Sequence, residues 1–157
     1  FAAPPIVQTP APVTYLSDNL DEKDSLGYCI DTVGRGFSDR LHAHSCKPRG
    51  GDVQFYYDKL KRQIVSATVS GKCATVSSLA VIDMTLGLVD CSSSSLLQLF
   101  HYDEITREFQ PQGDRSLCLS VGRKSKRAGP FMSRQLKLAI CSSTDKKYKQ
   151  WQIKIRQ

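Results

Sequence analysis

The stretch FYYDKLKRQI, from Phe55 to Ile64, is followed 45 residues later by FHYDEITREF, from Phe100 to Phe109, and the two align without a gap. Phenylalanine, the pair Tyr-Asp, an aliphatic residue, arginine and a final apolar residue recur in register. Self-similarity at a fixed period is typical of an architecture built from repeated structural units. The chain therefore contains at least two copies of one unit.

The six cysteines follow the same period. The first cysteine of each unit recurs at intervals of 44 and 45 residues, at Cys29, Cys73 and Cys118. The second follows after 17, 18 and 23 residues, at Cys46, Cys91 and Cys141. An aromatic residue comes nine or ten residues later, at Phe55, Phe100 and Trp151. Sequence alone does not choose among the pairings that six cysteines allow. Threefold repetition favours the pairing that is the same in every unit, which joins Cys29 to Cys46, Cys73 to Cys91 and Cys118 to Cys141.

Strands, not helices, are predicted within each unit. The fifth and third positions before each second cysteine are apolar in all units: Leu41, Ala43, Leu86, Leu88, Leu136 and Leu138. The intervening positions are mixed: His42, His44, Gly87, Val89, Lys137 and Ala139. This alternation is typical of strands with one side on a core, and no segment offers a sustained amphipathic helix. Three repeats of several short strands predict an all-β threefold barrel, since a propeller would usually have more blades.

Residues 1–25 differ from the repeats in composition. They contain four of the seven prolines and the acidic run DNLDEKD. We expect an arm, either extended along the barrel or flexible, before a domain over residues 26–157. The repeats are expected at about 26–69, 70–114 and 115–157.

Composition and charge narrow the class of protein. Hydrophobic residues make up 40% and charged residues 24%, and no apolar run is long enough to span a membrane. Phe1 is not a start methionine, and an even number of cysteines is typical of oxidising compartments, so we predict a secreted protein whose leader has been removed. The net charge of +7 favours acidic partners such as nucleic acid, anionic lipid or sulfated and sialylated glycans. The one basic cluster, GRKSKR at residues 122–127, is read as a solvated loop, and without interleaved aromatic residues nucleic acid is not expected.

At this point the chain resembles the ricin-type, or R-type, lectin domain, which is a β-trefoil of three units. The family signature of Cys-x-Asp, Cys and Gln-x-Trp is similar to CID, SC and QLF or KQW here. CIDTVGR (residues 29–35) and GGDVQFYY (residues 50–57) are most similar to the lectin module of the polypeptide GalNAc-transferases. The resemblance implies binding of terminal galactose or N-acetylgalactosamine in shallow pockets, in most members without a metal or other cofactor.

The resemblance places one carbohydrate site in the first unit. Asp31 matches the carboxylate that accepts hydrogen bonds from sugar hydroxyls, and alternation after Cys29 turns it outward to the edge of a pocket. His44 matches the aromatic residue that stacks on the sugar. Asp52 replaces the family's amide; it is read as a hydroxyl acceptor, as a calcium ligand beside Asp31, or as a turn residue after the two glycines. His42 and Lys47 are further candidate donors.

The other two units depart from this pattern. The aspartate position holds Thr75 or Ser120, the stacking position holds Val89 or Ala139, and the amide position holds Leu97, or Lys147 or Tyr148. Neither unit is expected to hold a sugar, so one site per chain is predicted.

Other functions are compatible with part of this pattern. No catalytic motif is present, and although Asp31 and Asp52 could imitate the two carboxylates of a glycosidase, we predict that the chain is not an enzyme. A β-trefoil that binds protein or heparin through residues 122–127, as an inhibitor or growth-factor-like ligand, is one alternative. The lectin part of a larger glycosyltransferase or toxin is another. A weak single site would need more than one chain for avidity, and a homodimer is the default expectation.

Overall fold

The computed structural model describes residues 7–16, 26–33, 39–76 and 86–155. These residues form fourteen strands and three short 3-10 helices, which confirms the all-β prediction. None of the described helices is long and apolar enough to cross a membrane. The short helices are η1 (Leu96–Gln98), η2 (Cys141–Ser143) and η3 (Lys146–Tyr148).

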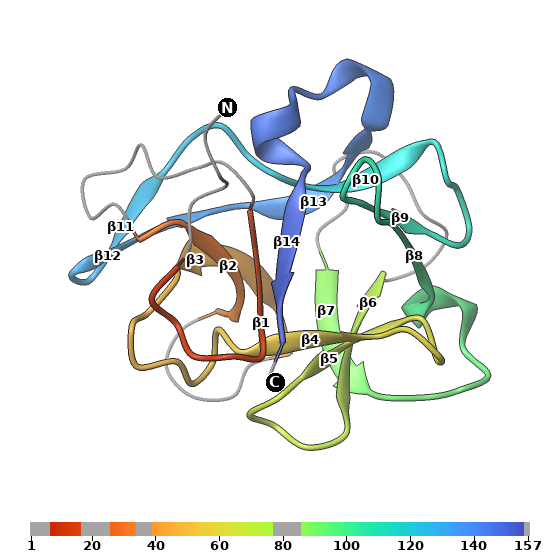
Figure 1. Cartoon of the computed structure of the whole chain (residues 1–157), viewed down its shortest axis with the longest axis horizontal. Coiled ribbons are helices and arrows are strands. Elements are labelled where there is room, and N and C mark those ends of the chain that lie inside the picture. The colour runs from red at the N-terminus through yellow and green to blue at the C-terminus, as the bar shows by residue number, and fades with distance from the viewer. Residues whose placement is uncertain (1–6, 17–25, 34–38, 77–85, 156–157) are drawn as a thin grey trace.

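Twelve of the fourteen strands fall into three groups of four. The first unit contains β1 (Val13–Leu16), β2 (Tyr28–Thr32), β3 (Leu41–Ser45) and β4 (Phe55–Asp58). The second contains β5 (Gln63–Ser66), β6 (Lys72–Val76), β7 (Leu86–Asp90) and β8 (Phe100–Asp103). The third contains β9 (Glu108–Pro111), β10 (Leu117–Val121), β13 (Leu136–Ile140) and β14 (Trp151–Lys154). This is the β-trefoil arrangement, and Figure 1 shows the three units around a common centre.

Three equivalent strand pairs join the units. The repeated stretch quoted above is the β4–β5 hairpin in its first copy and the β8–β9 hairpin in its second. The third pair joins the two ends of the chain, because β14 pairs with β1. The late aromatic opens each pair: Phe55 opposes Ser66, Phe100 opposes Pro111 and Trp151 opposes Leu16.

The N-terminal segment therefore differs from our expectation. We placed residues 1–25 before the barrel, whereas β1 is the first strand of the first unit and also pairs with β2. Val7, before β1, packs onto the barrel, since it is buried in a cluster with Val13 and Tyr15 of β1 and with the first disulfide. We defined the repeats by their cysteines. Because β1 lies before the first cysteine, the first repeat as we defined it left this strand out.

The turns of the two repeated hairpins explain why the sequence repeats there. Asp58 and Asp103 each accept hydrogen bonds from the backbone amides two and three residues further on, at 2.9–3.1 Å. Arg62 and Arg107 each take a left-handed backbone conformation, with φ of 57° and 63°. Aspartate is favoured in such turns because its side chain replaces a backbone acceptor.

One hydrophobic core lies between the units. All six apolar positions predicted from the alternation before the second cysteines belong to it, and Phe55, Phe100 and Trp151 are at most 1% exposed. All three predicted disulfides are present: Cys29 with Cys46, Cys73 with Cys91 and Cys118 with Cys141.

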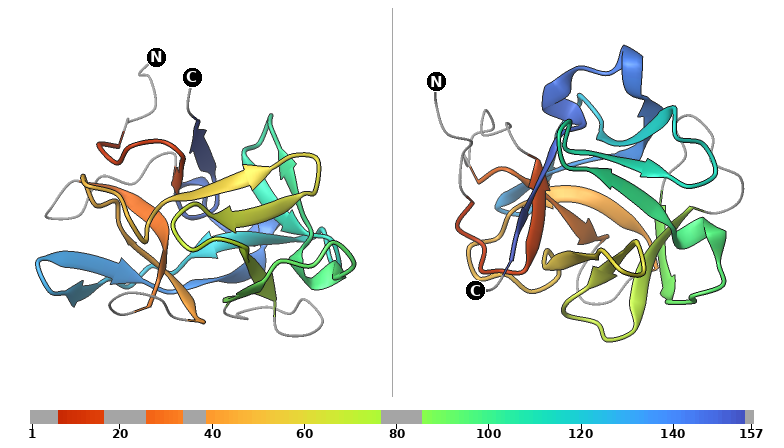
Figure 2. Two further views of the ribbon diagram at one scale, coloured as in Figure 1. Left: turned by 90° about the horizontal axis from the view of Figure 1, so that it is seen from below. Right: turned by 45° about the vertical axis from the view of Figure 1, so that its right-hand side comes forward.

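The two remaining strands form an additional hairpin in the third unit. They are β11 (Lys126–Ala128) and β12 (Phe131–Arg134), and they account for the longer interval of 23 residues between Cys118 and Cys141. Strand β12 pairs with β3 of the first unit, giving a six-stranded sheet in the order β11-β12-β3-β2-β1-β14. Figure 2 shows the hairpin beside the first unit. The cluster at residues 122–127 is exposed from Arg123 onward, as predicted, but its last two residues belong to β11 and not to a loop.

Candidate functional site

Asp31 lies on β2 and faces away from the main core. Its neighbour Ile30 is in the core and pairs with Ala43, whereas Asp31 pairs with His42 on the other face of the sheet. The direction is as expected from the alternation, but the exposure is not: Asp31 is 1% exposed. The side chains of His42 and His44 on β3 and of Lys47 after Cys46 cover it.

Three nitrogen-bearing side chains surround one carboxylate oxygen of Asp31. Asp31 Oδ2 lies 3.3 Å from His42 Nε2, 3.8 Å from His44 Nδ1 and 3.9 Å from Lys47 Nζ. Asp31 Oδ1 has no hydrogen-bond partner within the described ranges. A buried carboxylate is stable only when it is paired, so this cluster holds all four side chains in place. We define Asp31, His42, His44 and Lys47 as the Asp31 cluster.

The protonation of His44 is set by its surroundings. Burial lowers the pKa of His44, against the opposing effects of its hydrogen bond to the carbonyl oxygen of Ser45 (2.9 Å) and of the Asp31 charge. The ring is therefore neutral at neutral pH. A carbonyl only accepts hydrogen bonds, so Nδ1 carries the proton and Nε2 is left as an acceptor.

Asp52 lies near the Asp31 cluster on a turn. Gly50 and Gly51 before it both have left-handed φ values, 79° and 90°. The backbone N–H of Gln54 donates to the Gly51 carbonyl oxygen at 2.9 Å. Burial and then the Asp31 charge raise the pKa of Asp52, while Lys47 and His44 oppose the shift. Asp52 is thus both a turn residue and a half-buried carboxylate beside the cluster. Lys47 Nζ, 3.9 Å from Asp31 Oδ2, supplies positive charge beside that carboxylate, and the calcium alternative stays a prediction.

We expect Asp52→Asn to stabilise the protein at neutral pH. Because the folded pKa is raised above 3.8, the folded state binds more protons in that range, and stability falls as pH rises through the raised value. Removing the carboxylate should raise the free energy of unfolding at pH 7 by up to about 0.5 kcal/mol, after allowing for solvent screening. The gain should vanish at about pH 3, where both states are protonated. Denaturant titrations at both pH values measure it.

Asp114→Asn is the control with the opposite sign. Hydrogen bonds from the Ser116 side chain and backbone lower the pKa of exposed Asp114, so its ionised form favours the folded state. That variant should be no more stable than wild type at pH 7. A loss of stability in Asp52→Asn at pH 7 would contradict the stated origin of its pKa shift.

A pocket of about 380 Å³ adjoins the Asp31 cluster. His42, His44 and Lys47 line one side, and residues 128–131 of the β11–β12 hairpin line the other. The Phe131 ring lies 5.4 Å from the His44 ring at an angle of 60°. The sequence did not point to Phe131, and its only signal was the extra length between Cys118 and Cys141.

Strand register places the pocket residues on one face of the sheet. Ser133 on β12 opposes His44 on β3 and Lys126 on β11. Because directly opposed residues in paired strands share a face, Phe131, two positions before Ser133, is on this face too. The side chain of Ser45 on β3 and the backbone of Met132 on β12 hold these two strands together. Ser45 Oγ accepts from Met132 N at 2.9 Å and donates to Met132 O at 3.3 Å.

The equivalent position in the second unit lacks the charged groups of the first. The Thr75 hydroxyl lies 3.1 Å from its acceptor, the carbonyl oxygen of Val76. A side chain at Gly87, opposite Thr75, would approach the carbonyl oxygen of Asp39 at 3.2 Å. The first unit therefore packs closely against this position, and Val89 beside it carries no ring.

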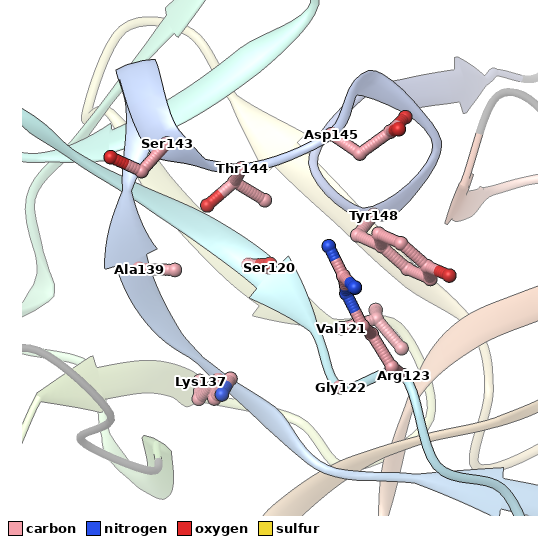
Figure 3. Close-up of a pocket in the computed structure, with 10 residues that line it drawn as sticks. All are labelled: Ser120, Val121, Gly122, Arg123, Lys137, Ala139, Ser143, Thr144, Asp145 and Tyr148. Atoms are coloured by element: carbon pink, nitrogen blue, oxygen red, sulfur yellow. The ribbon is translucent and has the colours of Figure 1, made fainter.

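The third unit has a small pocket where we expected no site. Ser120, Ala139 and Tyr148 border a volume of about 160 Å³, which Figure 3 shows. The Tyr148 ring is already in contact with cations, Lys147 at 5.3 Å and Arg123 at 5.5 Å from its centroid. Polar side chains are present, but no buried carboxylate corresponds to Asp31.

One compact group of ligand-type residues is found in the described part of the chain, and it does not form a metal site. Glu108, Cys118 and Cys141 lie together. The two sulfur atoms are bonded to one another, so neither is a thiolate that could bind a metal.

Comparison with solved structures gives the fold class. The chain has the β-trefoil fold. One similar structure is that of GalNAc-T7 with UDP, GalNAc and Mn²⁺, with a TM-score of 0.64, 16% identity and coverage of 92% of this chain and 22% of that one. Another is the Vibrio vulnificus hemolysin/cytolysin β-trefoil lectin with N-acetyl-D-lactosamine bound, with a TM-score of 0.60, 17% identity and coverage of 94% and 98%.

Sequence comparison adds no closer relative. No protein-family model matches the chain, and no curated protein matches it significantly. The chain spans about a fifth of the length of GalNAc-T7, 22%. These likenesses therefore establish the fold and leave the ligand to be argued from the site.

Proposed function

We propose that this chain is a carbohydrate-binding lectin whose main site is the pocket between the Asp31 cluster and Phe131. The observation that carries the proposal is the pairing of an apolar ring with hydrogen-bonding groups across one pocket. A sugar has the same two aspects, a ring face of C–H groups and an edge of hydroxyls. Its C–H face packs against Phe131, and its hydroxyls reach His44 Nε2 and Lys47 Nζ.

Terminal galactose and N-acetylgalactosamine are the sugars that fit this division best. The axial 4-hydroxyl of both leaves one ring face largely apolar, which suits an aromatic partner. The groups on the opposite side differ in kind: neutral His44 Nε2 accepts and Lys47 Nζ donates, while Asp52, beside the Asp31 cluster, is a further acceptor. A site with a donor and acceptors in fixed places distinguishes sugars by the positions of their hydroxyls.

Asp31 acts in this proposal as a positioning residue. It is buried beneath the side chains that line the pocket, so it fixes their orientation and does not itself reach the sugar. This differs from the role that the family resemblance implied, in which the carboxylate binds hydroxyls directly.

The three disulfides fit an extracellular protein that meets glycans on cell or mucosal surfaces. A single open site is expected to bind a monosaccharide with a Kd of about 0.1–1 mM, or about 4–5.5 kcal/mol. Useful avidity then requires more than one chain, and a homodimer is the simplest arrangement.

Phe131→Ala tests the proposal. We expect wild type to bind galactose and N-acetylgalactosamine but not mannose, and the variant to bind them about tenfold more weakly, since stacking contributes about 0.5–1.5 kcal/mol beyond area burial. Calorimetric titration or ligand-observed NMR measures the affinities. Retention of binding in EDTA is expected, because the site contains Lys47 in place of a metal.

Tyr56→Ala is the matched control, because Tyr56 is also half-buried on a strand but lies on β4, outside the pocket. It should leave the affinity unchanged. Equal affinity of wild type and Phe131→Ala for galactose would remove the pocket from consideration. Equal loss in both aromatic variants would indicate a general effect on folding.

A further inference from the structure

A second pocket, of about 520 Å³, adjoins the first at His42, which lines both. It lies between β3 and the segment that connects β10 to β12. Its side chains are mainly cationic, and among the residues that the structure describes no carboxylate lines it. We define the basic groove by these residues: Arg123, Lys124, Lys126, Arg134 and Lys137.

One cation of the basic groove is fixed in place. Arg134 is 8% exposed, and its guanidinium lies over the Tyr28 ring at 4.7 Å and donates to the carbonyl oxygen of Gly122 at 3.4 Å. Arg134 opposes Ala43, whose side chain is in the core, so its guanidinium lies on the face opposite to Lys126 and is not counted among the contacts of a bound anion.

The exposed cations of the groove are available to a ligand. Lys124 and Lys126 make no ion pair with any residue that the structure describes, and both are exposed. Arg123 lies at the border with the smaller third-unit pocket, against Tyr148, as Figure 3 shows. Lys124 and Lys126 are like charges two residues apart that repel one another, and an anion between them would relieve that repulsion.

Lys126 of the basic groove shares one face of the sheet with the Phe131 pocket. Lys126 opposes Ser133, and Ser133 opposes His44. Phe131 and Ser133 are two residues apart on β12, about 7 Å along a strand, which is close to the length of one sugar residue. A single glycan can therefore reach both.

We propose that the basic groove binds an anionic substituent, a sulfate or a carboxylate, of the glycan whose neutral sugar lies against Phe131. This inference rests on the proposed lectin function and names its substrate class: sulfated or sialylated galactosides. Sulfate and carboxylate oxygens accept charge-assisted hydrogen bonds from lysine and arginine in the same way, so the experiment separates the two sources.

The test compares three ligands: lactose, a sulfated lactose and sialyllactose. Wild type should bind at least one anionic ligand about tenfold more tightly than lactose, the effect expected of one charge-assisted contact. Lys126→Gln should reduce this preference to about threefold and Lys126→Glu should abolish it, while both leave the lactose affinity unchanged. Raising salt from about 0.05 M to 0.5 M should reduce the preference and spare lactose.

Lys61→Gln and Lys61→Glu are the matched controls, because Lys61 is an exposed lysine in the β4–β5 turn, outside both pockets. They should retain the preference. Which anionic ligand shows it identifies sulfate or carboxylate as the source.

The outcomes separate this inference from the proposed function. Binding of lactose with no preference for either anionic ligand would overturn the inference and leave the lectin intact. A preference that survives in Lys126→Glu would also overturn it. Binding of heparin and other polyanions with no lactose binding at all would overturn both, and would favour the heparin-binding alternative.

Discussion

Asp31→Asn is expected to reduce galactose affinity by about 30-fold or more. The substitution keeps the shape of the side chain but removes the charge that orients His42, His44 and Lys47. Only the His42 contact, at 3.3 Å, is a hydrogen bond, and a charge-assisted hydrogen bond is worth about 1.5–3 kcal/mol. The Asp31 charge raises the pKa of His44, so the variant should also show a lower His44 pKa. Calorimetry measures the affinity, and NMR titration of the histidine protons measures the pKa.

The repeats supply the controls for this prediction. Ser120→Ala and Thr75→Ala change the equivalent positions of the other units and should leave galactose binding as it is. If Asp31→Asn binds galactose like wild type, the first-unit pocket is not the site. If affinity falls while the His44 pKa stays constant, Asp31 contacts the sugar directly and does not act through the cluster.

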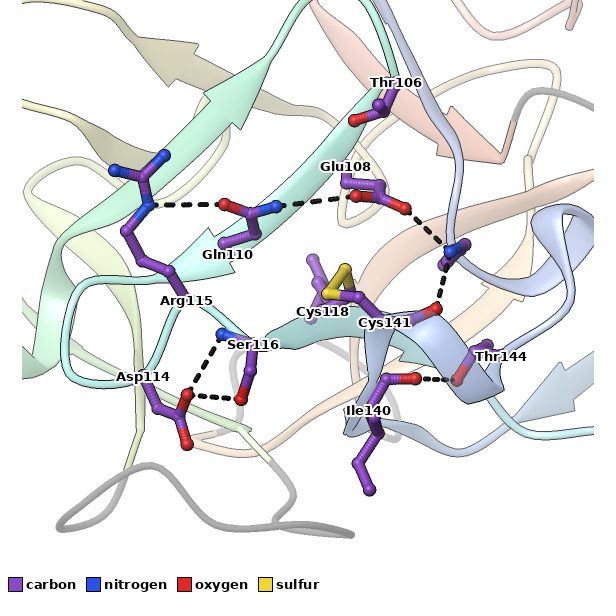
Figure 4. The surroundings of a disulfide bond; sticks show 12 residues. Thr106, Glu108, Gln110, Asp114, Arg115, Ser116, Cys118, Ile140, Cys141 and Thr144 are labelled. Atoms are coloured by element: carbon purple, nitrogen blue, oxygen red, sulfur yellow. Dashed lines mark hydrogen bonds and ion pairs between the residues drawn. A yellow bond between two sulfur atoms is a disulfide. The ribbon is translucent and has the colours of Figure 1, made fainter.

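Lys149→Met is expected to lower the free energy of unfolding by about 3 kcal/mol, because it leaves a largely buried carboxylate unpaired. Lys149 Nζ lies 2.8 Å from Glu108 Oε2, with the two side chains 12% and 11% exposed, and also donates to the Cys141 carbonyl oxygen at 2.6 Å. Figure 4 shows Glu108 and its interactions beside the Cys118–Cys141 disulfide. Chemical denaturation at pH 7 measures the change.

In the other two units, different residue pairs occupy the positions of Glu108 and Lys149. The strand pairs align Glu108 with Gln63 and Val13, and the residues two before the late aromatics are Lys149, Gln98 and Val53. In the second unit Gln63 Nε2 donates to Gln98 Oε1 at 3.2 Å. In the first unit the two valines are buried in one cluster. The same place thus holds an ion pair, an amide pair or an apolar pair.

A double substitution can therefore restore what the single one removes. Glu108→Gln with Lys149→Gln reproduces the second-unit pair and should recover most of the stability, to within about 1 kcal/mol of wild type. Equal destabilisation by Lys149→Met and by the double variant would show that the ion pair is not interchangeable with the amide pair. Sugar binding should stay the same throughout, because neither Glu108 nor Lys149 lines the Phe131 pocket.

The fold was predictable because its core repeats in the sequence. The leucines before each second cysteine, the late aromatics and the cysteine pairs occupy equivalent positions in all three units, so the pattern survives changes elsewhere. Strand β1 was missed for the opposite reason. Its residue Val13 takes the place of Gln63 and Glu108, and an apolar pair leaves no polar pattern to align.

The site was predictable only in the part that lies within one repeat. Asp31, His42, His44 and Lys47 are close in sequence, and they are brought together by one hairpin. Phe131 comes from an insertion in the third unit, and nothing local in the sequence states which strand an inserted hairpin will join. The burial of Asp31 was also missed, because alternation predicts the direction of a side chain and not what covers it.

The junction between β12 and β3 has a consequence for how binding and folding are linked. Ser45 and Met132 are 87 positions apart, and the sugar pocket exists only where their strands meet. A ligand that spans the junction binds only when the first and third units are packed together, so it stabilises their packed arrangement by mass action. Sugar binding therefore reports on folding, because only a chain in which the third unit has joined the first has a complete pocket.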